Sequence, residues 1–268
     1  MNSTMVTMLA GLSIATTTLA EDIDLFIVTG QSNARPAFAL GIESGLRASG
    51  EFDNVVVYNA QRSGNWLSQW MTDSNGEYSY AGNFLEDLWA PDGSSGLQQL
   101  IADLESDGDT VTVRGFFWWQ GEGDTGSVNA QNTYSERLQW MISELQGYYG
   151  DFDVMLTLID WNTAFPQSLE NIGRTPADVE AIRDALVDAA VSMDAMYFDS
   201  RGYPRADLWH VASSDDPRGY YAPVTDLGAD QARAFIESVF CPADLNNDGS
   251  LDFADVSAFL QLYADCGQ

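Results

Sequence analysis

Short runs of apolar residues alternate along the chain with segments whose apolar positions recur at helical spacing. The apolar runs predict buried strands at residues 24–30, 54–60, 111–121, 153–160 and 196–200. The helical spacing predicts helices at residues 96–106, 133–150, 175–193 and 227–240. The segment that follows the first strand is small and polar, and we predict no regular element there.

Strands that are apolar almost throughout and alternate with helices are typical of a parallel sheet covered on both faces. We therefore expect an α/β fold, a three-layer α/β/α sandwich with a central parallel sheet. In such sheets functional groups collect on the loops at the carboxyl ends of the strands. Ser32 follows the first predicted strand, Gln120 and Glu122 follow the third, and the segment 201–226 follows the fifth. These residues are predicted to meet at one edge.

The two ends of the chain differ in character from its middle. Residues 1–20 contain no acidic residue and have a short apolar core. They end in Thr-Leu-Ala and precede an acidic stretch, which is typical of a secretory signal cleaved after Ala20. A frayed N-terminal helix is the alternative. That apolar stretch is too short to span a bilayer securely, and no other stretch is a better candidate. We expect a main domain at residues 21–240, a separate tail at 241–268, and a secreted, extracellular or cell-surface protein.

The charge balance narrows the class of partner. The 268 residues contain 40 acidic and 11 basic side chains, a net charge of −29, and every basic residue is arginine. So acidic a protein is a poor partner for nucleic acid or for an anionic membrane. The composition fits a protein that works in salty water, where ions screen the repulsion between its own charges.

A serine, an aspartate and a histidine suggest nucleophilic catalysis. His210 is the only histidine in the chain, it lies in a loop-forming segment, and Asp207 precedes it by three residues. A serine hydroxyl needs a base that works near neutral pH, and that base needs a carboxylate to fix its tautomer. Ser32 is the candidate nucleophile. Its surroundings, Gly-Gln-Ser-Asn-Ala, lack the last glycine of the nucleophile elbow of α/β-hydrolases.

The motifs GQSN, WWQGEGD and DLWH occur in this order at residues 30–33, 118–124 and 207–210. Together they resemble the SGNH hydrolase superfamily, and within it the sialate O-acetylesterase and acetylxylan esterase-like group, carbohydrate esterase family six. The resemblance implies that Ser32 is the nucleophile, His210 the base and Asp207 its orienting acid. It also implies an oxyanion hole formed by the Ser32 amide, the Gly64 amide and the Gln120 side chain.

Other residues near these motifs have open roles. Gln31, Asn33 and Glu122 are candidates for contacts with substrate or for supporting hydrogen bonds. Glu122 and Asp124 could form a glycosidase-like carboxylate pair, but they are only two residues apart, and we favour a structural role for Glu122. Arg35 stands where the family has a different residue. It could approach an acidic sugar, although an ion pair with one of the many acids is the simpler interpretation.

Three tryptophans, Trp66, Trp118 and Trp119, could stack on a sugar ring, although large aromatic side chains usually belong to the core.

The tail carries a calcium-loop pattern. The oxygen-bearing side chains fall at the first, third, fifth, seventh, ninth and twelfth positions of such a loop, and Gly249 occupies the sixth, where the turn needs it. The predicted ligands are Asp244, Asn246, Asp248, Ser250, Asp252 and Asp255. The unit resembles one half of a type I dockerin, which implies a cohesin-like or cell-surface partner. Cys241 and Cys266 flank it and are disulfide candidates in an exported protein.

The sequence thus predicts a secreted serine esterase that removes O-acetyl groups from carbohydrate, such as acetylxylan or sialic-acid-type glycans. No cofactor is expected in catalysis, and Ca²⁺ is expected in the tail. One alternative is a non-catalytic, calcium-dependent carbohydrate-binding or anchoring protein. The other is a short-chain lipase or thioesterase of the same superfamily.

Overall fold

A single parallel sheet forms the centre of the molecule. The computed structural model describes residues 20–71, 96–163, 169–212 and 223–240. The strands stand in the order β2-β1-β3-β4-β5, and all neighbours are parallel. They are β1 (Asp22–Gly30), β2 (Val55–Gln61), β3 (Thr110–Trp119), β4 (Asp153–Leu158) and β5 (Met196–Asp199). All five predicted strands are confirmed.

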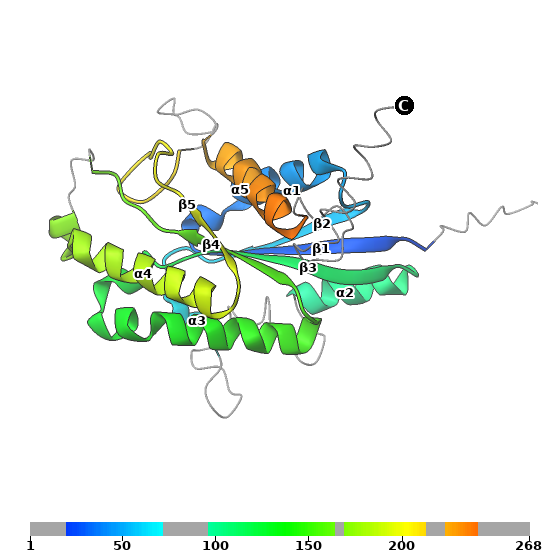
Figure 1. The fold of residues 1–268 in the computed structure, drawn as a ribbon, viewed down its shortest axis with the longest axis horizontal. Coiled ribbons are helices and arrows are strands. Elements are labelled where there is room, and N and C mark those ends of the chain that lie inside the picture. Colours follow the sequence, from blue (N-terminus) through cyan, green and yellow to red (C-terminus); the bar gives the residue numbers. More distant parts are fainter. Residues whose placement is uncertain (1–19, 72–95, 164–168, 213–222, 241–268) are drawn as a thin grey trace, which may run out of the picture.

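Helices cover both faces of the sheet, as expected for a three-layer sandwich. They are α1 (Pro36–Ser49), α2 (Gly96–Ser106), α3 (Val128–Tyr149), α4 (Pro176–Ser192) and α5 (Pro223–Val239). In Figure 1, α1 and α5 lie on one side of the sheet, and α2, α3 and α4 lie on the other. The predicted α/β/α fold is therefore confirmed for the described residues. The predicted C-terminal calcium-loop unit lies outside them.

Helix α1 is the element that the sequence pattern missed, because two glycines interrupt its apolar face. Those glycines lie where α1 packs against α5. A Cβ added at Gly41 would lie 2.1 Å from the carbonyl oxygen of Thr225 on α5, and one added at Gly45 would lie 2.6 Å from the Cβ of Ala232. On α5, a Cβ at Gly228 would lie 2.4 Å from the carbonyl oxygen of Phe38. The glycines allow the two backbones to approach closely, which local helix propensity does not reveal.

The aromatic end of β3 forms the middle of the core. Its alternate side chains face the two helical layers: Phe117 packs 5.0 Å from Phe235 of α5, whereas Trp118 Nε1 donates a hydrogen bond to Tyr134 of α3 at 3.2 Å. Trp119 packs against Phe38 of α1 at 4.9 Å. Both tryptophans are completely buried. The suggestion that Trp118 and Trp119 stack on sugar is therefore wrong.

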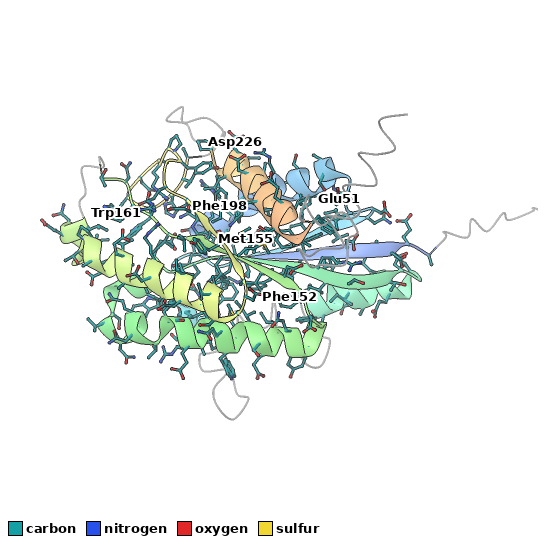
Figure 2. The ribbon with its side chains drawn as sticks, in the orientation of Figure 1. Glu51, Phe152, Met155, Trp161, Phe198 and Asp226 are labelled. Atoms are coloured by element: carbon teal, nitrogen blue, oxygen red, sulfur yellow. The ribbon has the colours of Figure 1, made fainter. Side chains whose placement is uncertain are left out.

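The interior and the periphery separate clearly around the sheet. Figure 2 shows side chains filling the space between the sheet and the helices, with Met155 of β4 and Phe152 among them; both are buried. Glu51 and Asp226 lie at the periphery and are exposed. None of the helices in the described part of the chain is both long and apolar enough to cross a bilayer.

The strand order places a crevice at the end of β1. The chain passes from β1 to β2 on one side and then returns to β3 on the other side of β1. At such a reversal, the loops leave the carboxyl ends of two neighbouring strands in opposite directions, and ligands bind in the crevice between them. Ser32 follows β1 and Gln120 follows β3 at this point.

Candidate active site

Ser32 is presented by a sharp turn at the end of β1. Gly30 has a φ of +135°, and a Cβ at this position would lie 2.1 Å from the carbonyl oxygen of Trp119. The same carbonyl accepts a hydrogen bond from the Gln31 amide at 2.9 Å. Only glycine allows the last residue of β1 to lie this close to β3. The turn then brings Ser32 to the start of a short 3₁₀ helix, Ser32–Ala34.

The three residues expected to form a catalytic triad lie together. His210 Nε2 is 2.6 Å from Ser32 Oγ, although the two residues are 178 positions apart. On the other side of the imidazole, Nδ1 is 2.8 Å from Asp207 Oδ2 and 2.9 Å from Oδ1. This is the arrangement in which a serine can lose its proton to a histidine whose tautomer a carboxylate holds.

Asp207 is kept ionised by its surroundings. Partial burial alone would raise the pKa of this carboxyl. The hydrogen bonds that it accepts from the His210 ring and from the backbone amides of His210 and Trp209 outweigh this effect, and they hold its pKa well below the usual range. A carboxylate that stays charged can stabilise the imidazolium that forms when Ser32 gives up its proton.

Three side chains hold the loop that carries Asp207 and His210: Asn33, Arg35 and Arg205. Arg205 Nη1 donates to the carbonyl of Trp209 at 2.6 Å, and the same carbonyl accepts from Asn33 Nδ2 at 3.2 Å. Asn33 Oδ1 accepts from the Val211 amide at 3.0 Å. Arg35 donates from Nη2 to the Val211 carbonyl. Arg35 is therefore an anchor of the histidine loop, and it does not line the cavity described next.

A cavity of about 500 Å³ opens beside the triad. This size falls in the range of roughly 300–1,000 Å³ that is usual for small-molecule sites. The lining residues are Gln31, Ser32, Ser63, Gly64, Trp66, Glu122, Gly123, Ile172, Arg174, Trp209 and His210. Of the three tryptophans proposed from the sequence, only Trp66 is here, with 39% of its surface exposed. The sequence pattern gave no role to Trp209, although it lies in the DLWH motif, or to Arg174, whose segment only folding brings to Ser32.

Two of the three expected oxyanion donors are at the cavity. Ser32 and Gly64 both line it, and within the described residues neither backbone amide has a hydrogen-bond partner. Gly64 has a φ of +76°, the left-handed conformation that glycine adopts without strain. Their amides are thus available to a ligand in the cavity.

The structure does not support Gln120 as the third oxyanion donor. Its side chain is completely buried, and its Nε2 lies 3.0 Å from the Asn65 carbonyl, 3.1 Å from Gln31 Oε1 and 2.5 Å from Asp124 Oδ2. Its Oε1 accepts from the Tyr134 hydroxyl at 2.6 Å. With all its polar atoms occupied inside the protein, Gln120 joins β3 to the neighbouring loops. The glutamine that lines the cavity is Gln31.

The two carboxylates of the QGEGD motif have separate environments. Asp124 accepts hydrogen bonds from Gln120 Nε2 and from the Leu67 amide at 3.0 Å, and it is almost completely buried. It does not line the cavity, so a glycosidase-like pair with Glu122 is not formed. Burial raises the pKa of Asp124 to about 6, against the lowering effect of its hydrogen bonds.

Glu122 is buried yet reaches the cavity wall. Its Oε1 accepts from Asn33 Nδ2 at 2.8 Å, in agreement with the expected structural role, and its Oε2 has no partner in the described residues. Burial raises the pKa of Glu122, although the hydrogen bond from Asn33 acts in the opposite direction. Burial therefore favours the uncharged form of this carboxyl.

The predicted ligands of the calcium loop and both cysteines lie outside the described residues. Within the described part of the chain, no group of three or more His, Cys, Asp or Glu side chains is arranged to hold a metal ion.

Comparison with known proteins agrees with the motifs. The model of a family described as "Carbohydrate esterase, sialic acid-specific acetylesterase" matches residues 77–214, a little more than half of the chain. This range contains Gln120, Asp207 and His210, whereas Ser32 precedes it. None of the curated proteins matches the chain significantly.

Several solved structures are similar at low sequence identity. An acetyl xylan esterase is 12% identical, with a TM-score of 0.47, and the match covers 80% of this chain and 99% of that one. A carbohydrate acetylesterase from Sinorhizobium meliloti is 11% identical, with a TM-score of 0.45 and coverage of 82% and 99%. A protein from Arabidopsis thaliana is 12% identical, with a TM-score of 0.48 and coverage of 80% and 98%.

Proposed function

Because the chain belongs to the carbohydrate esterase family of sialic acid-specific acetylesterases, we propose that it is a serine esterase that removes O-acetyl groups from carbohydrate. The observation that carries the proposal is the line of hydrogen bonds from Asp207 through His210 to Ser32, at 2.8 and 2.6 Å. The cavity beside Ser32 supports it, because an acetylated sugar needs room next to the nucleophile.

The geometry supports a two-step reaction through an acetyl-enzyme. Ser32 Oγ attacks the acetyl carbonyl carbon as His210 Nε2 accepts its proton, and the oxyanion that forms is held by the amides of Ser32 and Gly64. The intermediate collapses, the bond to the sugar oxygen breaks, and His210 returns the proton to that oxygen. A water molecule, deprotonated by His210, then attacks the acetyl-enzyme and releases acetate and Ser32.

Trp66 and Trp209 support a sugar as the leaving group. Both line the cavity, and Trp66 exposes a large apolar side chain beside a nucleophile. The face of a sugar ring carries C–H groups that pack on an aromatic ring, while its hydroxyls stay in contact with water or polar side chains. We propose that Trp66 contacts the sugar ring whose acetyl group Ser32 attacks.

The test is hydrolysis by the Ser32→Ala variant. We expect Ser32→Ala to lose release of 4-nitrophenol from 4-nitrophenyl acetate, and to lose acetate release from whichever of acetylated xylan, pectin, glucomannan or sialosides the wild type cleaves. Ser238→Ala, which removes an exposed hydroxyl on α5, is the matched control and should keep full activity. Full activity in Ser32→Ala would exclude the nucleophile and with it the mechanism.

The same panel separates the two alternatives. Sugar binding with no acetate release from any substrate would favour a non-catalytic binding or anchoring protein. Faster cleavage of acyl chains longer than acetyl would favour a lipase or thioesterase.

The ends of the chain carry further proposals that rest on the sequence. We propose that residues 1–20 direct secretion, and that the tail at 241–268 binds Ca²⁺ through the loop Asp244–Asp255 and anchors the protein to a cohesin-like or cell-surface partner. A bridge between Cys241 and Cys266 would close this unit. Calorimetric titration of the full chain with Ca²⁺, compared with an Asp248→Ala variant, tests the metal site; equal heats from both would exclude it.

A further inference from the structure

Arg174 lies at the wall of the active-site cavity and is held in one orientation. Its Nε donates to Thr125 Oγ1 at 2.7 Å and its Nη1 donates to the Ile172 carbonyl at 3.0 Å. The side chain is half-buried and contributes to the same cavity as Ser32 and His210. Two anchoring hydrogen bonds mean that little conformational entropy remains to be lost when this guanidinium binds a ligand.

The remaining nitrogen of Arg174 is given space by a glycine. A Cβ at Gly126 would lie 2.7 Å from Nη2, so a larger residue there would displace the guanidinium. Within the described residues, Nη2 has no hydrogen-bond partner, and Arg174 forms no ion pair with a carboxylate. Asp178, the acid whose pKa it helps to lower, is already hydrogen-bonded to Thr175 and Gln131.

Within the described residues, no carboxylate pairs with Arg174, although the chain is very acidic. The sequence has 40 acidic residues against 11 basic ones, and six described arginines form an ion pair with a carboxylate: Arg47, Arg114, Arg183, Arg201, Arg205 and Arg233. Besides Arg174, the cavity wall holds Glu122 and His210 as ionisable groups. Burial favours the neutral form of Glu122. Arg174 therefore supplies the permanent charge of this cavity, with a sign opposite to that of the whole protein.

We propose that Arg174 is a specificity-determining residue that binds an anionic substituent, a carboxylate or a sulfate, on the acetylated sugar cleaved at Ser32. The planar guanidinium presents paired N–H donors that match the oxygens of either group. This inference rests on the proposed function, since it concerns the substrate of that site. The sequence suggested Arg35 for such a role, but Arg35 anchors the histidine loop, whereas Arg174 lines the cavity.

The experiment compares substrates that differ in one charge. The substrates are methyl galacturonoside carrying one O-acetyl group, its methyl ester, and the correspondingly acetylated methyl galactoside 6-sulfate. The measured quantity is the ratio of kcat/KM for each anionic substrate to kcat/KM for the neutral ester. We expect wild-type protein to prefer an anionic substrate, and Arg174→Gln to lower that ratio roughly tenfold or more, chiefly through KM. Which anion is preferred identifies the substituent.

Two controls separate binding from general effects of charge and folding. Arg233→Gln makes the same change of net charge on the exposed face of α5, where Arg233 pairs with Asp230, and should leave the ratio at its wild-type value. Arg174→Lys keeps the positive charge but loses the planar pair of N–H donors, and it should retain part of the preference for the anionic substrate. Salt at about 1 M should weaken the preference of the wild type and not that of Arg174→Gln, because the contact is half-exposed.

A measurement on unmodified protein covers the case in which Arg174→Gln does not fold. Free methyl galacturonoside or free methyl galactoside 6-sulfate, whichever carries the preferred anion, should inhibit hydrolysis of 4-nitrophenyl acetate competitively, and more strongly than methyl galactoside. Inhibition by neither anionic sugar beyond that by methyl galactoside, or an unchanged ratio in Arg174→Gln, would overturn the assignment of Arg174. Loss of the proposed function is distinguishable, because the protein would then cleave none of the acetylated sugars and Ser32→Ala would keep its esterase activity.

Discussion

Asn33 connects three segments of the active site, so its removal should cost both stability and activity. It is completely buried, and its side chain binds the Glu122 carboxyl, the Trp209 carbonyl and the Val211 amide. We consider Asn33→Ala. The Trp209 carbonyl would keep its hydrogen bond from Arg205 at 2.6 Å, so it adds little to the cost.

The magnitude follows from the two groups that would lose a partner. These are the Val211 amide, in a residue with no exposed surface, and Glu122 Oε1. Each buried polar group without a partner costs about 1–3 kcal/mol, so the limits are about 2 and 6 kcal/mol. Water can enter the space that the shorter side chain leaves, which favours the lower half. We expect the free energy of unfolding to fall by about 3 kcal/mol.

Activity should fall as well, because Trp209 and Val211 flank His210. A loosened loop moves the imidazole relative to Ser32 Oγ, and a displacement of about 1 Å can cost roughly 100-fold in rate. The assays are urea unfolding followed by tryptophan fluorescence and kcat for 4-nitrophenyl acetate.

The matched control is Asn59→Ala. Asn59 also donates two hydrogen bonds, to the Val28 and Ala34 carbonyls at 3.0 and 2.8 Å, but it does not contact the histidine loop. It should lose stability with a much smaller loss of kcat. The reasoning is refuted if Asn33→Ala unfolds within about 0.5 kcal/mol of the wild type, or if both variants lose the same activity.

Three further predictions concern Asp124, Asp207 and the helix crossing. Burial raises the pKa of Asp124 from 3.8 to about 6, so its contribution to stability is present below pH 4 and is lost as the pH rises through 6. In urea unfolding, the stability of Asp124→Asn relative to wild type should therefore increase by up to about 3 kcal/mol between pH 4 and pH 8. A pH-independent difference between the two proteins would contradict this. Asp207→Asn should lower kcat on the order of 10³–10⁴-fold, since it reverses the tautomer that His210 needs. It should also lower the melting temperature at neutral pH, because the depressed pKa of Asp207 means that the ionised carboxylate stabilises the folded state; an active variant would be inconsistent with the triad. Gly41→Ala should destabilise the protein strongly in thermal unfolding, because its Cβ would meet a carbonyl oxygen of α5 at 2.1 Å, whereas Gly147→Ala, in open space on α3, should stabilise it by about 0.5–1 kcal/mol; similar melting temperatures would show that α1 and α5 can separate.

Periodicity was sufficient for most of the fold because burial imposes it. The central strands are covered on both faces, so their sequences are largely apolar, and α4 begins with a Thr-Pro start whose capping box the structure contains. The exception is α1, whose Gly41 and Gly45 weaken the helical pattern locally. Their benefit is a close contact with α5, almost 190 residues later in the chain, which no local pattern can express.

The chemistry divides in the same way. Ser32, Asp207 and His210 could be proposed from the sequence because the chain has one histidine, Asp207 precedes it by three residues, and Ser32 directly follows a predicted strand in the GQSN motif. The roles of glutamine, tryptophan and arginine side chains could not be assigned in this way. Their roles depend on which neighbours satisfy their polar atoms.

By itself, the sequence determined the layered α/β fold and the three candidate triad residues, because apolar periodicity and short motifs are both local properties. Only the tertiary structure decided that Gln120 is buried, that Trp66 rather than Trp118 reaches the cavity, and that Arg174 rather than Arg35 lines it. The physical reason is that a polar or aromatic side chain acts on a substrate only if no other part of the protein already surrounds it. That condition depends on segments far apart in the chain.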